Sequence, residues 1–170
     1  MKKNMITIAL GVVAVMMMTT VVDLRAYAMT GDGRGEAAQK APAPDFALTS
    51  VSGKTVSLKD FKGKNVILFF FATWCPYCRE KIPGLTQNYA LYQSQWIDVV
   101  LIDAGESQQK VESFAKKQGL SFDILLDKDS KVSESYGVMG IPTFVLINKE
   151  GMIVDEDNEL PGNYQDLLMK

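Results

Sequence analysis

The sequence predicts an α/β domain in which helices flank a mixed sheet and a β-hairpin precedes it. The first observation is a continuous apolar run at residues 66–71, which is typical of a strand buried on both faces. The second is the recurrence of apolar residues at steps of three and four after Pro76, which indicates an amphipathic helix. The third is the alternation of further strand and helix patterns before a second hairpin, which indicates a mixed sheet.

Composition limits the size and the class of the protein. The chain has 170 residues, of which 47% are hydrophobic, and this is enough for one domain with its own core. A net charge of −2 gives no indication of a nucleic-acid partner. The absence of histidine excludes Ser-His and Cys-His catalysis.

Residues 1–28 are predicted to be a targeting segment. A lysine pair precedes an apolar run at residues 5–22, and Ala26-Tyr27-Ala28 follows as a small-x-small cleavage signal. As a helix the run would be about 27 Å long, nearly enough to span a bilayer. A signal peptide and an N-terminal membrane anchor both remain open. Both predict an extracytoplasmic protein, in the periplasm or at the outer face of the cytoplasmic membrane.

The remaining chain divides into a linker and a domain. Residues 29–43 are rich in Gly, Ala and Pro and are predicted to be a flexible linker, so that the folded domain is residues 44–170. The elements expected in it are a hairpin (46–48 and 55–58), strand 66–71, a long helix from Pro76 to Trp96, strand 97–102, helix 107–118, strand 122–126, helix 130–136, strands 143–147 and 152–155 around a turn at Gly151, and a short last helix.

The long helix defines the surroundings of the cysteines. Its buried face is predicted to carry Cys78, Ile82, Leu85, Tyr89, Tyr92 and Trp96. Pro76 suits the first helical position. The backbone N–H of a residue there has no partner within the helix, so proline, which lacks this N–H, loses no hydrogen bond. Pro83 falls inside the helix and is expected to kink it.

Cys75 and Cys78 are the two cysteines of the chain and are separated by two residues. Cys75 is expected just before the first helical turn, where unpaired N–H groups and the helix dipole favour a thiolate. Cys78 begins the buried face. An exposed thiolate beside a shielded thiol is the arrangement that thiol–disulfide exchange needs.

Two structural alternatives are weaker. A purely structural disulfide closing so short a ring would contribute roughly 2 kcal/mol, less than a longer crosslink. A zinc site would lack ligands, because the chain has two cysteines and no histidine. We therefore predict redox exchange, no metal, and no cofactor other than the Cys75–Cys78 disulfide.

A second motif, Gly140-Ile141-Pro142-Thr143, places a proline directly before an apolar strand. Alone it could be an ordinary turn. Together with Trp74-Cys75-Pro76-Tyr77-Cys78 and Pro83, it resembles the thioredoxin superfamily over roughly residues 44–168. The leader, the N-terminal hairpin, Ala72-Thr73 and Gly105-Glu106-Ser107 resemble the exported TlpA/ResA-type members.

The resemblance implies a thioredoxin-like mixed sheet and a role for each site residue. Cys75 would be the attacking thiolate and Cys78 the resolving thiol, and Ile141–Pro142 would be a cis bond lying against the disulfide. The implied substrate-binding residues are Trp74, Pro76, Tyr77, Ile141, Pro142 and Thr143. The implied partners are disulfides of other exported proteins, apocytochrome c among them, and a membrane or extracytoplasmic thiol as electron donor.

Two positions depart from the family pattern. The polar or acidic residue expected six positions before the first cysteine is Phe69, and the acid expected three positions after the second is Lys81. On a helix Lys81 would lie about 60° from Cys78 and Glu80 about 200° from it. We therefore expect Lys81 near the thiols and Glu80 in solvent, and both are candidates for tuning the cysteine pKa.

The expected activity is that of a thiol–disulfide oxidoreductase, and its direction stays open. Reduction of exported disulfides is the first hypothesis. A disulfide oxidase or isomerase is the alternative, because Pro76 also occurs in oxidising active sites. A peptide-binding module with an inert CxxC is the third. A peroxidase is disfavoured because no separate cysteine is present.

Overall fold

The computed structural model describes residues 41–120 and 122–169. The predictions for residues 1–28 and for residues 29–40 of the linker lie outside these ranges. The last part of the predicted linker is not free chain, because Ala41–Pro42 forms strand β1 and pairs antiparallel with β8. The sheet therefore begins earlier than residue 44. Among the described residues, none of the helices combines the length and the apolar character needed to cross a bilayer.

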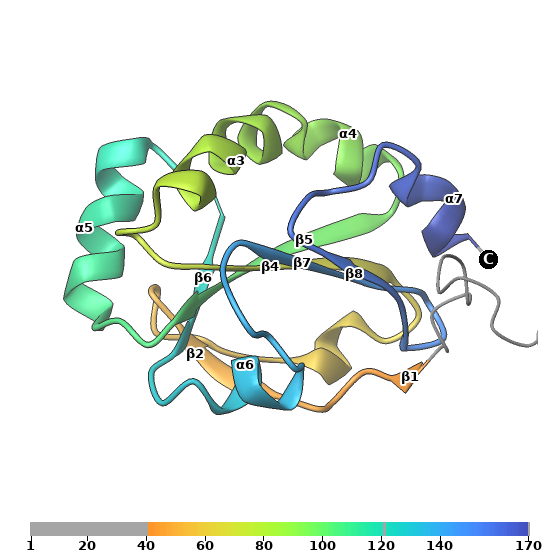
Figure 1. The fold of residues 1–170 in the computed structure, drawn as a ribbon, viewed down its shortest axis with the longest axis horizontal. Coiled ribbons are helices and arrows are strands. Elements are labelled where there is room, and N and C mark those ends of the chain that lie inside the picture. Colours follow the sequence, from red (N-terminus) through yellow and green to blue (C-terminus); the bar gives the residue numbers. More distant parts are fainter. Residues whose placement is uncertain (1–40, 121, 170) are drawn as a thin grey trace, which may run out of the picture. The chain divides into compact units, whose positions relative to one another are not determined.

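The predicted mixed sheet is confirmed (Figure 1). Its order is β1-β8-β7-β4-β5-β6-β2-β3 among the described residues. β4 is parallel to β5, and β5 to β6, whereas β7, β8 and β2 run antiparallel to their neighbours. The remaining strands are β2 (Ala47–Ser50), β3 (Thr55–Ser57), β4 (Asn65–Phe71), β5 (Ile97–Ala104), β6 (Ile124–Asp127), β7 (Thr143–Ile147) and β8 (Met152–Asp157). The predicted N-terminal hairpin is the β2–β3 pair.

Helices cover both faces of the sheet (Figure 1). Helices α3, α4, α5 and α7 lie on one side, with α6 and the 3₁₀ helix η1 on the other. Their bounds are η1 (Leu58–Phe61), α3 (Pro76–Gln87), α4 (Tyr89–Ser94), α5 (Gln108–Gln118), α6 (Lys131–Ser135) and α7 (Tyr164–Leu168). The central strand β4 is buried on both faces, as predicted. Its alternate side chains enter two separate cores, Ile67, Phe69 and Phe71 in one and Val66, Leu68 and Phe70 in the other.

The prediction of one long helix to Trp96 is wrong. The helical stretch is interrupted at Asn88, whose side-chain amide donates to the Gly84 carbonyl at 2.9 Å. α4 ends at Ser94, and the chain then turns sharply to enter β5. This turn gives Trp96 a left-handed φ of 58° and leaves it 83% exposed, so it does not belong to the buried face. α3 itself continues through Pro83.

Candidate active site

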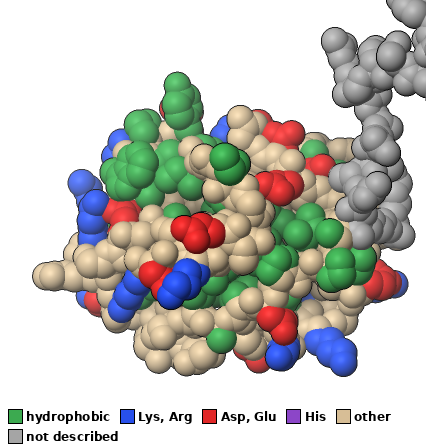
Figure 2. Space-filling view, turned by 60° about the horizontal axis from the view of Figure 1, so that its bottom comes forward, with side chains coloured by type: hydrophobic (Ala, Val, Ile, Leu, Met, Phe, Trp, Pro, Cys, Tyr) green, Lys and Arg blue, Asp and Glu red, His purple; other side chains and the backbone are tan. Residues whose placement is uncertain are grey.

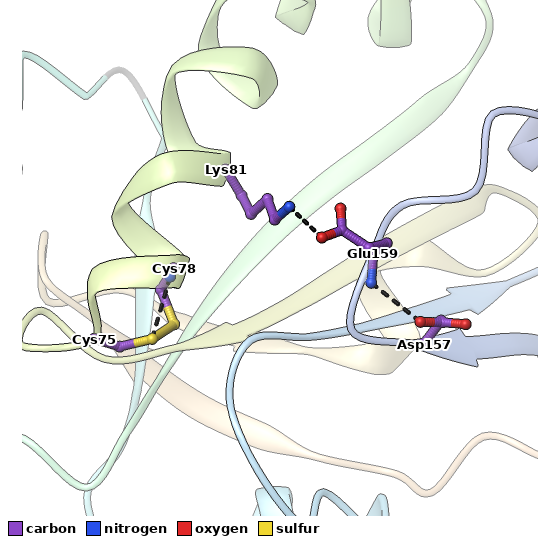
Figure 3. A network of polar contacts seen from close by, with 5 residues as sticks. All are labelled: Cys75, Cys78, Lys81, Asp157 and Glu159. Carbon is purple, nitrogen blue, oxygen red and sulfur yellow. Dashed lines mark hydrogen bonds and ion pairs between the residues drawn. A yellow bond between two sulfur atoms is a disulfide. The ribbon is translucent and has the colours of Figure 1, made fainter.

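The turn between β4 and α3 brings the two cysteines together in a disulfide (Figure 3). Cys75 is the N-cap residue of α3 and has an extended backbone, and Pro76 occupies the first turn. The Cys78 backbone N–H points at the Cys75 sulfur at 3.1 Å. An anionic sulfur at this position is stabilised by that N–H and by the positive end of the helix dipole.

Cys75 is less accessible than the sequence suggested. In the disulfide it is only 3% exposed, whereas an exposed sulfur was expected, and Cys78 is fully buried. The loop that the resemblance placed against the disulfide covers it. The carbonyl oxygen of Ile141 lies 3.8 Å from the Cys75 sulfur, and the Ile141 side chain packs against the same core.

This loop precedes β7 and carries the second motif. The Ile141–Pro142 peptide bond is cis, as the resemblance implied. The Thr143 hydroxyl donates to the Gly140 carbonyl at 2.7 Å and closes the turn around the proline. Because β7 pairs with β4, the loop is brought beside the CxxC turn although 66 residues separate Ile141 from Cys75.

A groove of about 560 Å³ lies beside the disulfide. Four of the predicted substrate-binding residues line it: Tyr77, Ile141, Pro142 and Thr143. Pro76 and Trp74 are exposed but are not among its lining residues. Trp74, Tyr77 and Met139 are large exposed apolar side chains near the disulfide and the proline loop. Figure 2 shows hydrophobic side chains projecting from the end of the molecule at which Figure 1 has the β4–α3 turn.

The two candidate pKa-tuning residues point in different directions. Lys81 lines the groove, and its ammonium group forms an ion pair with Glu159 (Figure 3). Lys81 was expected near the thiols. It lies one helical turn after Cys78 on α3, but its side chain extends toward Glu159 and away from the disulfide. Glu80 is exposed and is not a lining residue.

Three acidic residues of the groove were missed in the sequence. Glu156, Asp157 and Glu159 form an acidic wall of the groove, and the Glu159 backbone N–H donates to the Asp157 carboxylate at 3.2 Å. Burial, followed by the charge of Asp155, raises the pKa of Glu156. The signal for this wall was the acidic run after residue 154, together with the antiparallel return of the last hairpin toward Thr143.

The aromatic surroundings of Phe69 do not suit an acidic side chain. Phe69 is fully buried, stacks on Phe71 and contacts Phe144 at a ring-centroid distance of 4.6 Å. Two of the buried carboxyl groups at this end of the sheet lie near the CxxC turn instead. They are those of Asp103, which pairs in register with Phe71, and of Glu106, which binds Thr73. Among the described residues no cluster of three or more His, Cys, Asp or Glu could hold a metal ion.

Several proteins that are similar to this chain in sequence are named thiol-disulfide oxidoreductases. Residues 40–156 match the AhpC/TSA family. The chain is 38% identical over 114 residues to thiol-disulfide oxidoreductase ResA of Bacillus thuringiensis subsp. konkukian, covering 67% of this chain and 66% of the relative. It is 38% identical over 122 residues to ResA of Bacillus subtilis, covering 72% of this chain and 68% of the relative.

A solved structure with a similar fold carries the same kind of name. A putative thiol:disulfide interchange protein DsbE from Chlorobium tepidum superposes with a TM-score of 0.67 at 29% identity, covering 76% of this chain and 92% of the other. Together with the CxxC disulfide and the adjoining cis-proline loop, these matches assign the chain: it belongs to the AhpC/TSA family and has that family's thioredoxin fold.

Proposed function

We propose that this protein is an exported thiol–disulfide oxidoreductase that reduces disulfides in other extracytoplasmic proteins. The observation that carries the proposal is the Cys75–Cys78 disulfide at the start of α3, beside a groove formed with the cis-proline loop. A structural crosslink has no need of such a groove. The similarity to proteins named thiol-disulfide oxidoreductase supports the same activity.

The two cysteines have different roles in this mechanism. In the reduced protein the Cys75 thiolate, favoured by the helix start, attacks one sulfur of a client disulfide, and the other client sulfur leaves as a thiolate. Cys78 then loses its proton and attacks Cys75 in the mixed disulfide. The client leaves as a dithiol, the Cys75–Cys78 disulfide forms, and two electrons have passed to the client. An extracytoplasmic or membrane thiol donor restores the reduced state.

The groove favours an extended client segment. Tyr77 and Met139 provide exposed apolar contacts, and the backbone beside Pro142 is available for pairing with a peptide strand. Apocytochrome c is a candidate client by analogy with the family. Export is supported by the basic and apolar leader predicted at residues 1–28.

Trapping tests the proposal. With Cys78→Ser, attack by Cys75 on a client disulfide should proceed and then stall, so that mixed disulfides accumulate and can be identified by mass spectrometry after non-reducing electrophoresis. Cys75→Ser is the matched control and should trap nothing. Adducts that form with Cys75→Ser instead would reverse the assigned roles. Turnover that persists without Cys75 would remove the oxidoreductase proposal.

The opposite direction of electron flow has one observation in its favour. The Cys78 N–H and the helix start stabilise a Cys75 thiolate, and stabilising the reduced form makes a disulfide more oxidising. The reduction potential separates the alternatives. A value near that of thioredoxin, roughly −270 mV, fits a reductase, whereas a value near that of DsbA, roughly −120 mV, fits an oxidase.

A further inference from the structure

A buried carboxylate holds the turn that presents Cys75. Glu106 is 8% exposed and accepts two hydrogen bonds from Thr73, one from its backbone N–H at 2.5 Å and one from its hydroxyl at 2.9 Å. Thr73 lies two residues before Cys75. The turn is closed on its other side by the Cys75 N–H, which donates to the Ala72 carbonyl at 3.1 Å.

The backbone after β5 places Glu106 for this contact. Gly105 has φ of 88°, and a Cβ there would lie 3.3 Å from the Ser130 hydroxyl, so the position suits glycine. The chain therefore turns tightly after Ala104 and directs Glu106 toward the β4–α3 turn. Lys110, one turn into α5, forms an ion pair with Glu106 from the solvent side.

The carboxyl group of Asp103 holds the backbone of Glu106. Its Oδ1 accepts the Glu106 backbone N–H at 3.0 Å. Its Oδ2 is buried and has no hydrogen-bond partner among the residues that the structure describes. An ionised carboxylate with one such oxygen would be costly in a buried site, whereas a protonated carboxyl is tolerated.

The two carboxyl groups therefore divide their protonation states. Burial raises the pKa of Asp103 to about 8, and the negatively charged side chain of Glu106 adds to this effect, whereas the hydrogen bond from the Glu106 backbone N–H and the charge of Lys110 oppose it. Burial also opposes ionisation of Glu106, but hydrogen bonds from Lys110 and Thr73 outweigh it and lower the pKa of Glu106. At neutral pH Glu106 is charged and Asp103 carries a proton. Lys110 on α5 is the cation that acts on both carboxyl groups. Asp127, on the neighbouring strand β6, directs its carboxylate to Ser133. The cysteines of the neighbouring turn titrate once the disulfide is reduced.

We propose that Glu106 and Asp103 are positioning residues for thiol–disulfide exchange: Glu106 fixes the Thr73–Cys75 turn, and the proton on Asp103 keeps Glu106 in place. When Asp103 loses its proton, a second negative charge appears beside Glu106 in the same buried site. The hold on Thr73 weakens, and Cys75 is presented less well. This inference rests on the proposed exchange at Cys75.

The reaction of Cys75 with a small disulfide measures this effect. In the full chain carrying Cys78→Ser, Cys75 is the single thiol, and its second-order rate with 5,5′-dithiobis(2-nitrobenzoate) is followed from pH 6 to 10. The rate should rise as Cys75 ionises and then fall below a single-titration curve above about pH 8, where Asp103 loses its proton. Asp103→Asn should follow one titration throughout.

Variants of Glu106 separate positioning from charge. Glu106→Ala should lower the maximum rate about tenfold, the cost of a charge-assisted hydrogen bond. Glu106→Gln should recover most of that rate, because its amide oxygen still accepts from the Thr73 N–H. Charge removal alone would instead lower the pKa of Cys75 and leave the maximum rate unchanged. Glu112→Gln is the matched control. It removes an acid of α5 that pairs with Lys116, and its rate profile should be that of the parent.

The outcomes separate this inference from the proposed function. If the parent does not react, the proposed exchange fails. If the parent reacts and folded Glu106→Ala reaches the same maximum rate, the positioning role is overturned. If Glu106→Ala does not fold, Thr73→Ala replaces it. This variant removes the Thr73 hydroxyl, one of the two donors to Glu106, and should lower the maximum rate. The inference would also be overturned if Thr73→Ala kept the maximum rate of the parent and Asp103→Asn kept its pH profile.

Discussion

Reversing the charge of Lys81 should shift the redox chemistry of the disulfide by a small and calculable amount. Lys81 lies three residues after Cys78 on α3, which places its Cβ about 5–6 Å from that of the cysteine. Its ammonium group is directed toward Glu159, so the cation and the anion largely cancel each other's field at the sulfurs. Lys81→Glu removes the cation and leaves two adjacent anions.

The magnitude follows from the charge change and the open groove. Two charge units on the order of 10 Å from a sulfur amount to about 1 kcal/mol at the dielectric constant of water, and physiological salt reduces this by half or more. The anions disfavour the thiolate, so the pKa of Cys75 rises and the disulfide becomes harder to reduce. The expected shift in reduction potential is about 10 mV toward more reducing values.

Equilibration with thiol–disulfide buffers, read by the fraction of reduced protein, measures this shift. Glu159→Gln should move the potential in the opposite direction, because it leaves the Lys81 cation unbalanced. The double variant Lys81→Glu/Glu159→Lys restores a pair and should lie near the wild type. Glu80→Lys is the control on the exposed side of the helix and should have no effect. A larger effect from Glu80→Lys than from Lys81→Glu would refute the assigned orientation of the helix.

Three further predictions concern stability. Phe69→Asp, which would restore a polar side chain at the family position, should lower the free energy of unfolding by at least about 3–5 kcal/mol, the cost of removing a buried ring, and the buried carboxyl group adds to this loss. Denaturant unfolding measures the loss, with Phe69→Leu as the milder control. Asp103 keeps its proton up to about pH 8 in the folded chain, although its unperturbed pKa is 3.8, so the stability it provides is complete below pH 3.8 and is lost as the pH rises toward 8. Asp103→Asn should remove that decline in pH-dependent unfolding curves. Trp96→Asn should leave stability unchanged or raise it by up to about 1 kcal/mol, because the ring is exposed and a left-handed φ suits asparagine; a loss above 2 kcal/mol in thermal unfolding would contradict the exposure of Trp96.

Features that depend on residues close together in the sequence could be predicted from it. The β4 run is hydrophobic at every position because both of its faces are covered, and that is the pattern of a central strand. The CxxC position at the start of α3 followed from Pro76 and the apolar spacing after it. The interruption at Asn88 was not readable in this way, because Trp96 continues the apolar spacing while the backbone has already left the helix.

The parts of the site that involve distant segments were harder to predict. The groove wall of Glu156, Asp157 and Glu159 depends on the pairing of β8 with β7, which brings Asp157 opposite Phe144. The direction of Lys81 depends on that wall, because its partner is Glu159. Helical geometry alone gives the side of α3 from which Lys81 projects, but it does not give the anion toward which a long, flexible side chain extends.

The carboxyl groups around the disulfide show why a site can depart from its family pattern and stay polar. At Phe69 the side chain lies between Phe71 and Phe144, so an acid there would be buried among aromatic rings without a partner. Asp103 lies two residues beyond Leu101, the strand neighbour of Phe69, and so at the end of β5, where the sheet meets the CxxC turn. There the Glu106 backbone N–H donates to Asp103, and the Thr73 backbone N–H donates to Glu106. The aromatic rings around Phe69 offer no such donors. A carboxyl group at the end of β5 can therefore act on Cys75 through the backbone of its turn, and its loss should change the pH profile of Cys75 as well as the pH dependence of unfolding.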